Sequence, residues 1–135
     1  MANPIKNYLF VYGTLRRDGD NDMYKLLARH ARFLCDGWFN GKLYNVTYYP
    51  CAVPSDIPED KVYGEVYELL EPEYILQKLD DYEECSEKFP PPREYRREIR
   101  SIHIANDDVI DAWIYIYNYD VGNLRQIKSG DFFNQ

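Results

Sequence analysis

The sequence predicts an α+β domain, a small mixed β-barrel of about five to six strands with two short flanking helices. Three observations indicate this class. The chain of 135 residues holds 14 tyrosines, a residue type that suits half-buried strand positions. Apolar runs typical of strands recur along it, and two stretches show helical spacing instead. Their order, β-α-β-β-α-β-β, without repeats or a linker, predicts a single domain over residues 1–135.

The first expected element is a buried strand over residues 8–12, the continuous apolar run YLFVY. A polar loop from Arg16 to Asp22 follows, and Asn21 or Asp22 is a suitable N-cap for a helix from Met23 to Leu34. One apolar stripe at helical spacing supports that helix: Met23, Leu26, Leu27, Ala31 and Leu34.

The middle of the chain alternates between strand and helix signals. Residues 37–49 are aromatic and β-prone, and three prolines between positions 50 and 58 indicate a loop after them. Residues 61–70, KVYGEVYELL, are expected to form a strand. Residues 71–84 are expected to form a helix with Pro72 in its first turn, where a proline is tolerated.

The last third contains a predicted hairpin. Three consecutive prolines in residues 85–94, CSEKFPPPRE, exclude regular structure there. Residues 95–105 and 109–117 are expected to be strands joined by a turn at Asn106-Asp107-Asp108. Residues 118–135 show no strong period.

The charge balance argues against a nucleic-acid partner. The formal net charge is −7, whereas nucleic-acid binding requires neutralisation of phosphates. The one basic cluster, Arg93 to Arg100, is interleaved with Glu94 and Glu98 and therefore predicts a charged strand face.

Three cysteines, Cys35, Cys51 and Cys85, are odd in number and lack CxxC spacing, which argues against a disulfide framework and a structural zinc site. The N-terminus has no apolar segment of signal-peptide type, and no stretch approaches membrane-spanning length. We therefore expect a cytoplasmic protein that does not associate with membranes.

Glu83 is the most informative residue of the predicted helix. On a projection of about 100° per residue it lies beside Leu76 and inside the apolar arc, whereas Asp80 lies at the border of that arc. Desolvation in an apolar cleft would raise the pKa of Glu83 toward neutrality, as a general acid/base requires. The alternative is a helix end that has already left the core, with Glu83 in water.

The junction Tyr12-Gly13-Thr14-Leu15-Arg16 supplies complementary chemistry after the first strand. Glycine lets the backbone turn closely around a ligand, and consecutive N–H groups in such a turn hold an anion. Thr14 adds a hydroxyl and Arg16 a charge. Alone, this is a weak signal, because most Gly-Thr pairs after a strand form ordinary turns.

Together these segments resemble a known family. In chain order, VYGTLRR, VYGEVYEL, LDDYEE, YRR, AWIYIY and SGDF are similar to the γ-glutamylcyclotransferase-like proteins, and most similar to the subgroup of γ-glutamylamine cyclotransferase and plant AIG2-like proteins. The resemblance covers nearly the whole chain. YGTLR and LDxxE are specific as a pair, though neither is so alone.

The resemblance implies a barrel with a cavity at one end, a small-molecule γ-glutamyl substrate, and no metal or cofactor. The implied reaction is attack of the α-amine of a γ-glutamyl group on its own γ-carbonyl, which forms 5-oxoproline and releases an amine or amino acid. Glu83 corresponds to the family's essential glutamate. Tyr12, Gly13, Thr14 and Leu15 correspond to its glutamyl-binding loop, and Tyr95 to a tyrosine that lines the site. Arg16 and Asp80 are expected only as supporting charges.

Two departures from the family pattern stand out. The family often has glycine after the essential glutamate, where this chain has Glu84. The spacing from Glu83 to Tyr95 is longer than usual because residues 86–94 resemble an insertion, which we interpret as a lid or a specificity element. The leaving amine and the oligomeric state stay open.

Other interpretations are weaker. A non-catalytic small-molecule binder would keep the cavity but has no need of Glu83, and a two-carboxylate glycosidase lacks a second inward acid. Cys85 has no identifiable base partner and is interpreted as a passive thiol. We interpret His30 and His103 as structural, and Arg97 as ordering its strand face.

Overall fold

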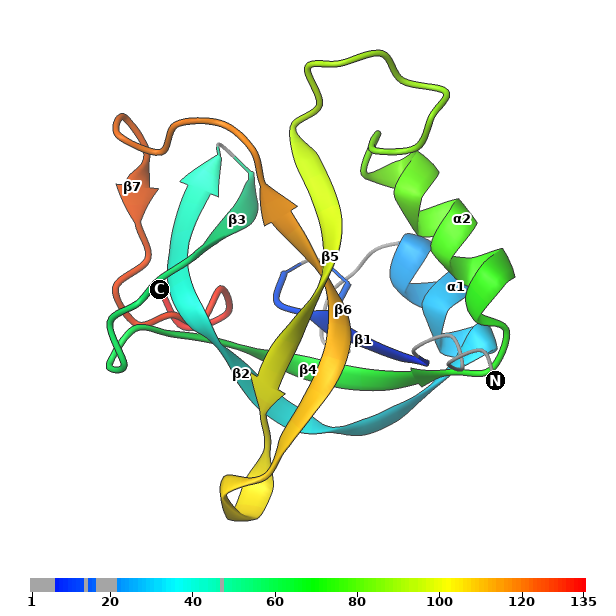
Figure 1. Ribbon diagram of the computed structural model, residues 1–135, viewed down its shortest axis with the longest axis horizontal. Coiled ribbons are helices and arrows are strands. Elements are labelled where there is room, and N and C mark those ends of the chain that lie inside the picture. Colours follow the sequence, from blue (N-terminus) through cyan, green and yellow to red (C-terminus); the bar gives the residue numbers. More distant parts are fainter. Residues whose placement is uncertain (1–6, 14, 17–21, 47) are drawn as a thin grey trace.

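The computed structural model describes residues 7–13, 15–16, 22–46 and 48–135 (Figure 1). Two helices and seven strands make up these ranges, together with a short 3-10 turn at Ala105–Asp107. The helices are α1 (Asp22–His30) and α2 (Pro72–Tyr82). The strands are β1 (Tyr8–Val11), β2 (Ala31–Val46), β3 (Tyr49–Pro54), β4 (Lys61–Leu69), β5 (Tyr95–His103), β6 (Val109–Tyr117) and β7 (Arg125–Gln126).

Five strands close into a barrel, which confirms the predicted fold class. The sheet runs β3-β2-β4-β1-β6-β5, and an additional pairing of β2 with β5 joins its ends into a ring. β1 pairs in parallel with β6, and the other pairs are antiparallel, so the barrel is mixed. The long strand β2 leaves the ring at its C-terminal half, where it pairs with β3 and β7.

The apolar run of β1 is explained by burial on both of its faces. Leu9 and Val11 belong to the core beneath the helices, whereas Phe10 and Tyr12 belong to the core inside the barrel. A strand covered on both faces has a continuous apolar run in place of alternation. Tyr12 is the last residue of this run. It directly follows β1 and faces the barrel interior.

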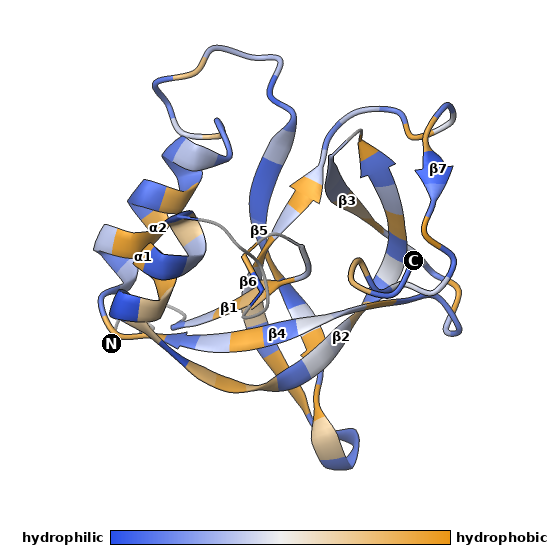
Figure 2. Cartoon of the chain, turned by 180° about the vertical axis from the view of Figure 1, so that it is seen from behind, coloured by the Kyte–Doolittle hydropathy of each residue, from blue (hydrophilic) through white to orange (hydrophobic). Residues whose placement is uncertain are grey.

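Both helices lie on one side of the barrel (Figure 1). Leu27 of α1 and Leu79 of α2 are fully buried in the same core cluster as Leu9. Each helix also carries hydrophilic residues, and the loop after α2 is mostly hydrophilic (Figure 2). The helix predicted over 71–84 is present as α2, which spans Pro72–Tyr82 and has Pro72 in its first turn.

The helix predicted from Met23 to Leu34 ends earlier, at His30. From Ala31 the chain pairs with β4, where Ala31 lies opposite Leu69 and Phe33 opposite Tyr67. Leu34 sits at an irregularity in that pairing and is 43% exposed, so its place in the apolar stripe was misleading. Pairing with a distant strand overrides the local helical spacing here.

The loop predicted from Pro50 is also wrong at its start, because Tyr49–Pro54 form β3. Among the described strands, β3 pairs with β2 alone and is an edge strand, which is where a sheet accepts proline. β7 was not predicted, since two residues are too few to show a pattern. The predicted turn between β5 and β6 is present, with Asn106 at φ 62° and Asp107 at φ 60°.

Candidate functional site

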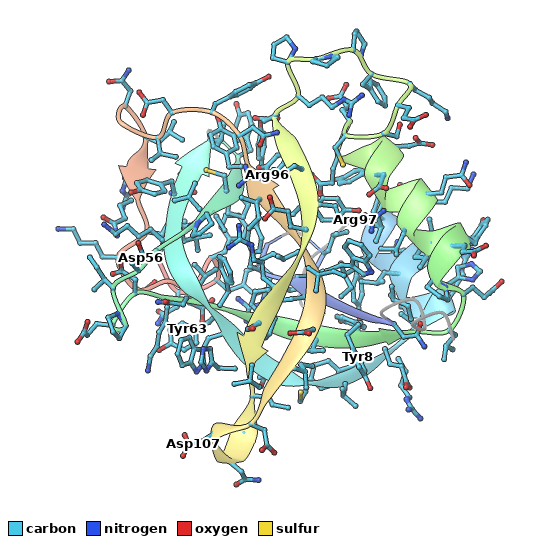
Figure 3. The ribbon with its side chains drawn as sticks, in the orientation of Figure 1. Tyr8, Asp56, Tyr63, Arg96, Arg97 and Asp107 are labelled. Carbon is cyan, nitrogen blue, oxygen red and sulfur yellow. The ribbon has the colours of Figure 1, made fainter. Side chains whose placement is uncertain are left out.

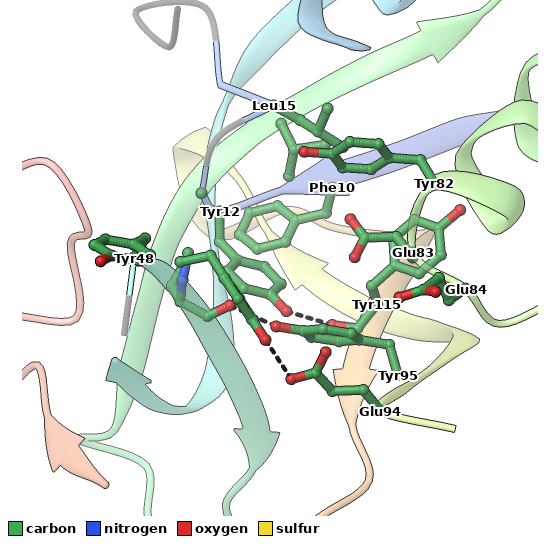
Figure 4. Close-up of a pocket in the computed structure, with 14 residues that line it drawn as sticks. Phe10, Tyr12, Leu15, Tyr48, Tyr82, Glu83, Glu84, Glu94, Tyr95 and Tyr115 are labelled. Carbon is green, nitrogen blue, oxygen red and sulfur yellow. Dashed lines mark hydrogen bonds between the residues drawn. The ribbon is translucent and has the colours of Figure 1, made fainter. Parts of the chain in front are cut away.

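A cavity of about 450 Å³ lies at one end of the barrel, between the end of β1, the start of β3, the C-terminal end of α2 and the start of β5 (Figure 4). Much of its wall is aromatic, which accounts for part of the tyrosine content. The tyrosines that line it are Tyr12, Tyr48, Tyr49, Tyr82, Tyr95 and Tyr115. Three carboxylates also face it: Glu83, Glu84 and Glu94.

Glu83 is the C-cap residue of α2. Its backbone N–H donates to the Leu79 carbonyl at 2.8 Å, so the last helical turn holds its position. Its side chain is half-buried and points into the cavity, as Figure 4 shows. Although the helix ends at Tyr82, the chain stays against the barrel, and Glu83 does not simply extend into water.

The surroundings of Glu83 disfavour its charged form. Burial, followed by the negative charges of Glu94 and Asp80, raises the pKa of this carboxyl from 4.5 to about 7. A group that changes protonation near neutral pH suits both acceptance and donation of a proton.

The chain reverses after Glu83 through a Schellman motif. Glu84 N donates to Asp81 O at 3.1 Å and Cys85 N donates to Asp80 O at 2.9 Å. Glu84 has φ 57°, the left-handed conformation that such a motif requires and that glycine adopts without strain. The left-handed backbone conformation therefore explains why the family pattern often has glycine at this position.

Glu84→Gly should stabilise the fold by about 1 kcal/mol, because it relieves the left-handed strain of a residue with a Cβ. The matched control is Glu84→Ala, which removes the same carboxylate but keeps the Cβ. Urea denaturation would measure the free energy of unfolding of both variants. Equal stability of the glycine and alanine variants would refute this explanation.

The predicted substrate loop forms part of the cavity wall. Tyr12, Gly13 and Leu15 line it, and Thr14 lies outside the described residues. Arg16 N donates to the Gly13 carbonyl at 3.0 Å and closes the turn. Gly13 itself lies against Pro50 of β3, since a Cβ built on Gly13 would be 2.5 Å from Pro50 Cγ.

Arg16 is directed to the C-terminal segment and does not line the cavity. Its Nη1 donates to Asp131 Oδ1 at 2.6 Å, and its guanidinium carbon lies 4.4 Å from the centroid of the Phe133 ring. These contacts link the turn after β1 to the end of the chain.

Tyr12 and Tyr95 both lie in the cavity wall, and their hydroxyl protons are already used. Tyr12 Oη donates to the Tyr115 carbonyl at 2.6 Å, and Tyr95 Oη donates to the Pro50 carbonyl at 2.8 Å. Burial raises the pKa of both phenols well above the ordinary value of 10. They therefore contribute neutral aromatic surface.

Glu94 is a cavity carboxylate that the sequence interpretation missed. It accepts a hydrogen bond from Tyr49 Oη at 2.6 Å. The position of Glu94 directly before Tyr95 could have indicated that it lies at the cavity. The sequence interpretation instead places it on a charged strand face. The charged face consists of alternate residues of β5, on which Glu98 pairs with Arg96 and with Arg100.

Asp80 and Arg97 lie behind the cavity wall, not in it. Arg97 Nε and Nη2 donate to the two Asp80 carboxylate oxygens at 2.7 and 2.9 Å. Figure 3 shows Arg97 on the α2 side of β5, with Arg96 on the other side. Arg97 thus ties its strand to α2 and is not part of the charged face.

The remaining candidates lie outside the cavity wall. His30 Nδ1 is 2.7 Å from Glu71 Oε1, and His103 stacks on Trp38 with centroids 3.8 Å apart. Burial raises the pKa of the Cys85 thiol to about 12, which agrees with a passive role. Of residues 86–94, only Glu94 lines the cavity.

Among the residues that the structure describes, no group of three or more His, Cys, Asp or Glu side chains is arranged to hold a metal ion. Neither α1 nor α2 has the length and hydrophobicity needed to cross a bilayer, and they are the α-helices of the described chain.

Residues 9–134 match the family model described as "Gamma-glutamyl cyclotransferase, AIG2-like". The chain is 34% identical over 132 residues to a putative gamma-glutamylcyclotransferase of Vibrio cholerae, covering 95% of this chain and 96% of that protein. It is 30% identical over 128 residues to the gamma-glutamylcyclotransferase family protein YtfP of Escherichia coli, covering 94% of this chain and 96% of that protein.

Solved structures share the fold. The solution structure of E. coli YtfP superposes with a TM-score of 0.64 at 30% identity, covering 94% of this chain and 96% of that chain. A mouse AIG2-like protein superposes with a TM-score of 0.63 at 24% identity, covering 87% of this chain and 90% of that chain, a likeness of fold alone.

Proposed function

Because the chain belongs to the gamma-glutamyl cyclotransferase, AIG2-like family, we propose that it releases 5-oxoproline from a γ-glutamyl amine or a γ-glutamyl amino acid. Glu83 acts as the general acid and base. The observation that carries this proposal is the half-buried Glu83 carboxyl, which points into an aromatic cavity and has its pKa raised to about 7.

The reaction needs proton transfer more than a protein nucleophile. The α-nitrogen of the substrate forms the new bond to the γ-carbonyl carbon, and the bond from that carbon to the leaving nitrogen breaks. An α-ammonium loses two protons on its way to the lactam N–H, and the leaving nitrogen gains two as it departs as an ammonium ion. One carboxyl that accepts and donates in turn balances this transfer.

Holding the two reacting atoms together supplies much of the rate, because the attack is intramolecular. In this proposal the turn after β1 holds the glutamyl group. Backbone N–H groups of Gly13 and Leu15 bind its carboxylate or the oxygen on which charge develops. The rings of Tyr12 and Tyr95 supply the walls that exclude water.

The test is incubation of the protein with a panel of γ-glutamyl amines and γ-glutamyl dipeptides, with 5-oxoproline measured by mass spectrometry. We expect release from at least one member of the panel. Binding of a panel member without release would support the alternative, a small-molecule binder that keeps the barrel cavity.

A further inference from the structure

A polar network centred on Asp80 lies directly behind the cavity wall. Its carboxylate accepts both Arg97 donors, at 2.7 and 2.9 Å, and the Tyr115 hydroxyl at 2.8 Å. The Cys85 sulfur lies 3.8 Å from the same carboxylate. One side chain of α2 is therefore bonded to β5, to β6 and to the segment that follows the helix.

The Arg97–Asp80 pair is held in one geometry. The two guanidinium N–H groups donate to the two carboxylate oxygens in a bidentate arrangement, which fixes the relative orientation of the two side chains. The guanidinium carbon also lies 4.1 Å from the centroid of the Trp113 ring. The side chains are only 21% and 17% exposed, so water screens this pair less than an open surface pair.

Tyr115 connects this network to the cavity. Its ring lines the cavity, its hydroxyl is bonded to Asp80, and its carbonyl accepts the Tyr12 hydroxyl at 2.6 Å. The Asp80 backbone carbonyl accepts the Cys85 N–H that closes the turn after Glu83, so the Asp80 side chain lies next to the end of α2 that carries Glu83.

We propose that Asp80 and Arg97 are positioning residues for the reaction. Asp80 fixes the Tyr115 wall and the end of α2 that carries Glu83, and Arg97 fixes Asp80 while neutralising its charge. The expected effect on rate rests on the proposed function, whereas the effect on the Glu83 carboxyl does not.

The charge balance around Glu83 makes the proposal testable. Titratable and charged groups face Glu83 from each element packed around it. They are Asp80 and Tyr82 of α2, Glu84 and Cys85 after it, Tyr48 and Tyr49 at the start of β3, Glu94, Tyr95 and Arg97 at the start of β5, Tyr115 on β6, and Tyr12 after β1. Loss of the Asp80 charge leaves Arg97 unopposed and favours ionised Glu83. Loss of Arg97 leaves the negative charge of Asp80 unopposed and therefore disfavours the ionised form of Glu83.

The experiment follows the Glu83 carboxyl by carbon-detected NMR titration in Asp80→Asn, Arg97→Met and the double variant. We expect the Glu83 midpoint to fall by about half a pH unit or more in Asp80→Asn and to rise by a similar amount in Arg97→Met. The double variant should return close to wild type. Arg100→Met is the control, since it removes the same charge from β5 but faces Glu98.

Kinetics supplies a second readout. Arg97→Met should lower kcat by about tenfold or more with little change in KM, because the reacting groups are misaligned after binding. Arg97→Lys should keep the Glu83 midpoint near wild type and recover part of the kcat. Should Arg97→Met fail to fold, the titration rests on Asp80→Asn, and a kcat of Arg97→Lys below that of wild type replaces the kinetic test.

The proposal is overturned if the midpoints in Asp80→Asn and Arg97→Met stay at the wild-type value or move in the same direction, or if Arg97→Met leaves kcat unchanged. A protein that releases no 5-oxoproline defeats the proposed function but leaves the titration readable. The two failures are therefore distinguishable.

Discussion

Glu83→Gln should reduce 5-oxoproline release by about a hundredfold to ten-thousandfold, the usual contribution of a positioned general acid/base. Glutamine keeps the size and hydrogen-bonding ability of the side chain but neither accepts nor donates the proton that the reaction moves. The loss should appear mainly in kcat, because the cavity and the turn after β1 still hold the substrate. Quantified 5-oxoproline release over a range of substrate concentrations separates the two constants.

The control is Glu73→Gln, the same change at an exposed position of α2, which should keep wild-type activity. Thermal unfolding of Glu83→Gln at pH 8 would test whether the fold survives the change. The raised pKa means that Glu83 stabilises the fold least when ionised, above about pH 7, so its glutamine variant should be no less stable than wild type there. Retained activity in Glu83→Gln would end the assignment of this residue.

Gly13→Ala should lower kcat/KM by about tenfold or more, chiefly by raising KM. The new Cβ would lie 2.5 Å from Pro50 Cγ and 2.9 Å from its Cδ, so the turn or β3 has to move. Movement of Pro50 also disturbs the carbonyl that accepts the Tyr95 hydroxyl. Overpacking of this kind should cost about 1–3 kcal/mol of stability as well.

The matched control for this change is Gly122→Ala, on an exposed loop. A Cβ there would meet nothing closer than an Asp120 carboxylate oxygen at 3.4 Å. The measurements are steady-state kinetics and thermal unfolding of both variants. A wild-type KM in Gly13→Ala would mean that the turn does not hold the substrate.

The strands and helix that could be predicted are those with a strong local pattern. β1 is a continuous apolar run, α2 has both a helical stripe and a first-turn proline, and β5 and β6 flank a recognisable turn. The early end of α1 and the edge strand β3 depend on pairing with distant strands. Local spacing does not contain that information.

Part of the cavity lining was likewise predictable from the sequence. The inward direction of Glu83 followed from helical geometry, and the loop containing Gly13 followed from the family resemblance. Glu94 and Tyr115 were missed because closure of the barrel brings them to the cavity. The pairing of Asp80 with Arg97 crosses from a helix to a strand, and only the folded chain shows it.

The central claim is that the cavity holds Glu83 as a carboxyl that titrates near neutral pH. The most direct test is carbon-detected NMR titration of the wild-type side chain, with its resonance assigned by comparison with Glu83→Gln. We expect a midpoint of about 7. A midpoint near the ordinary value of 4.5 would contradict this claim.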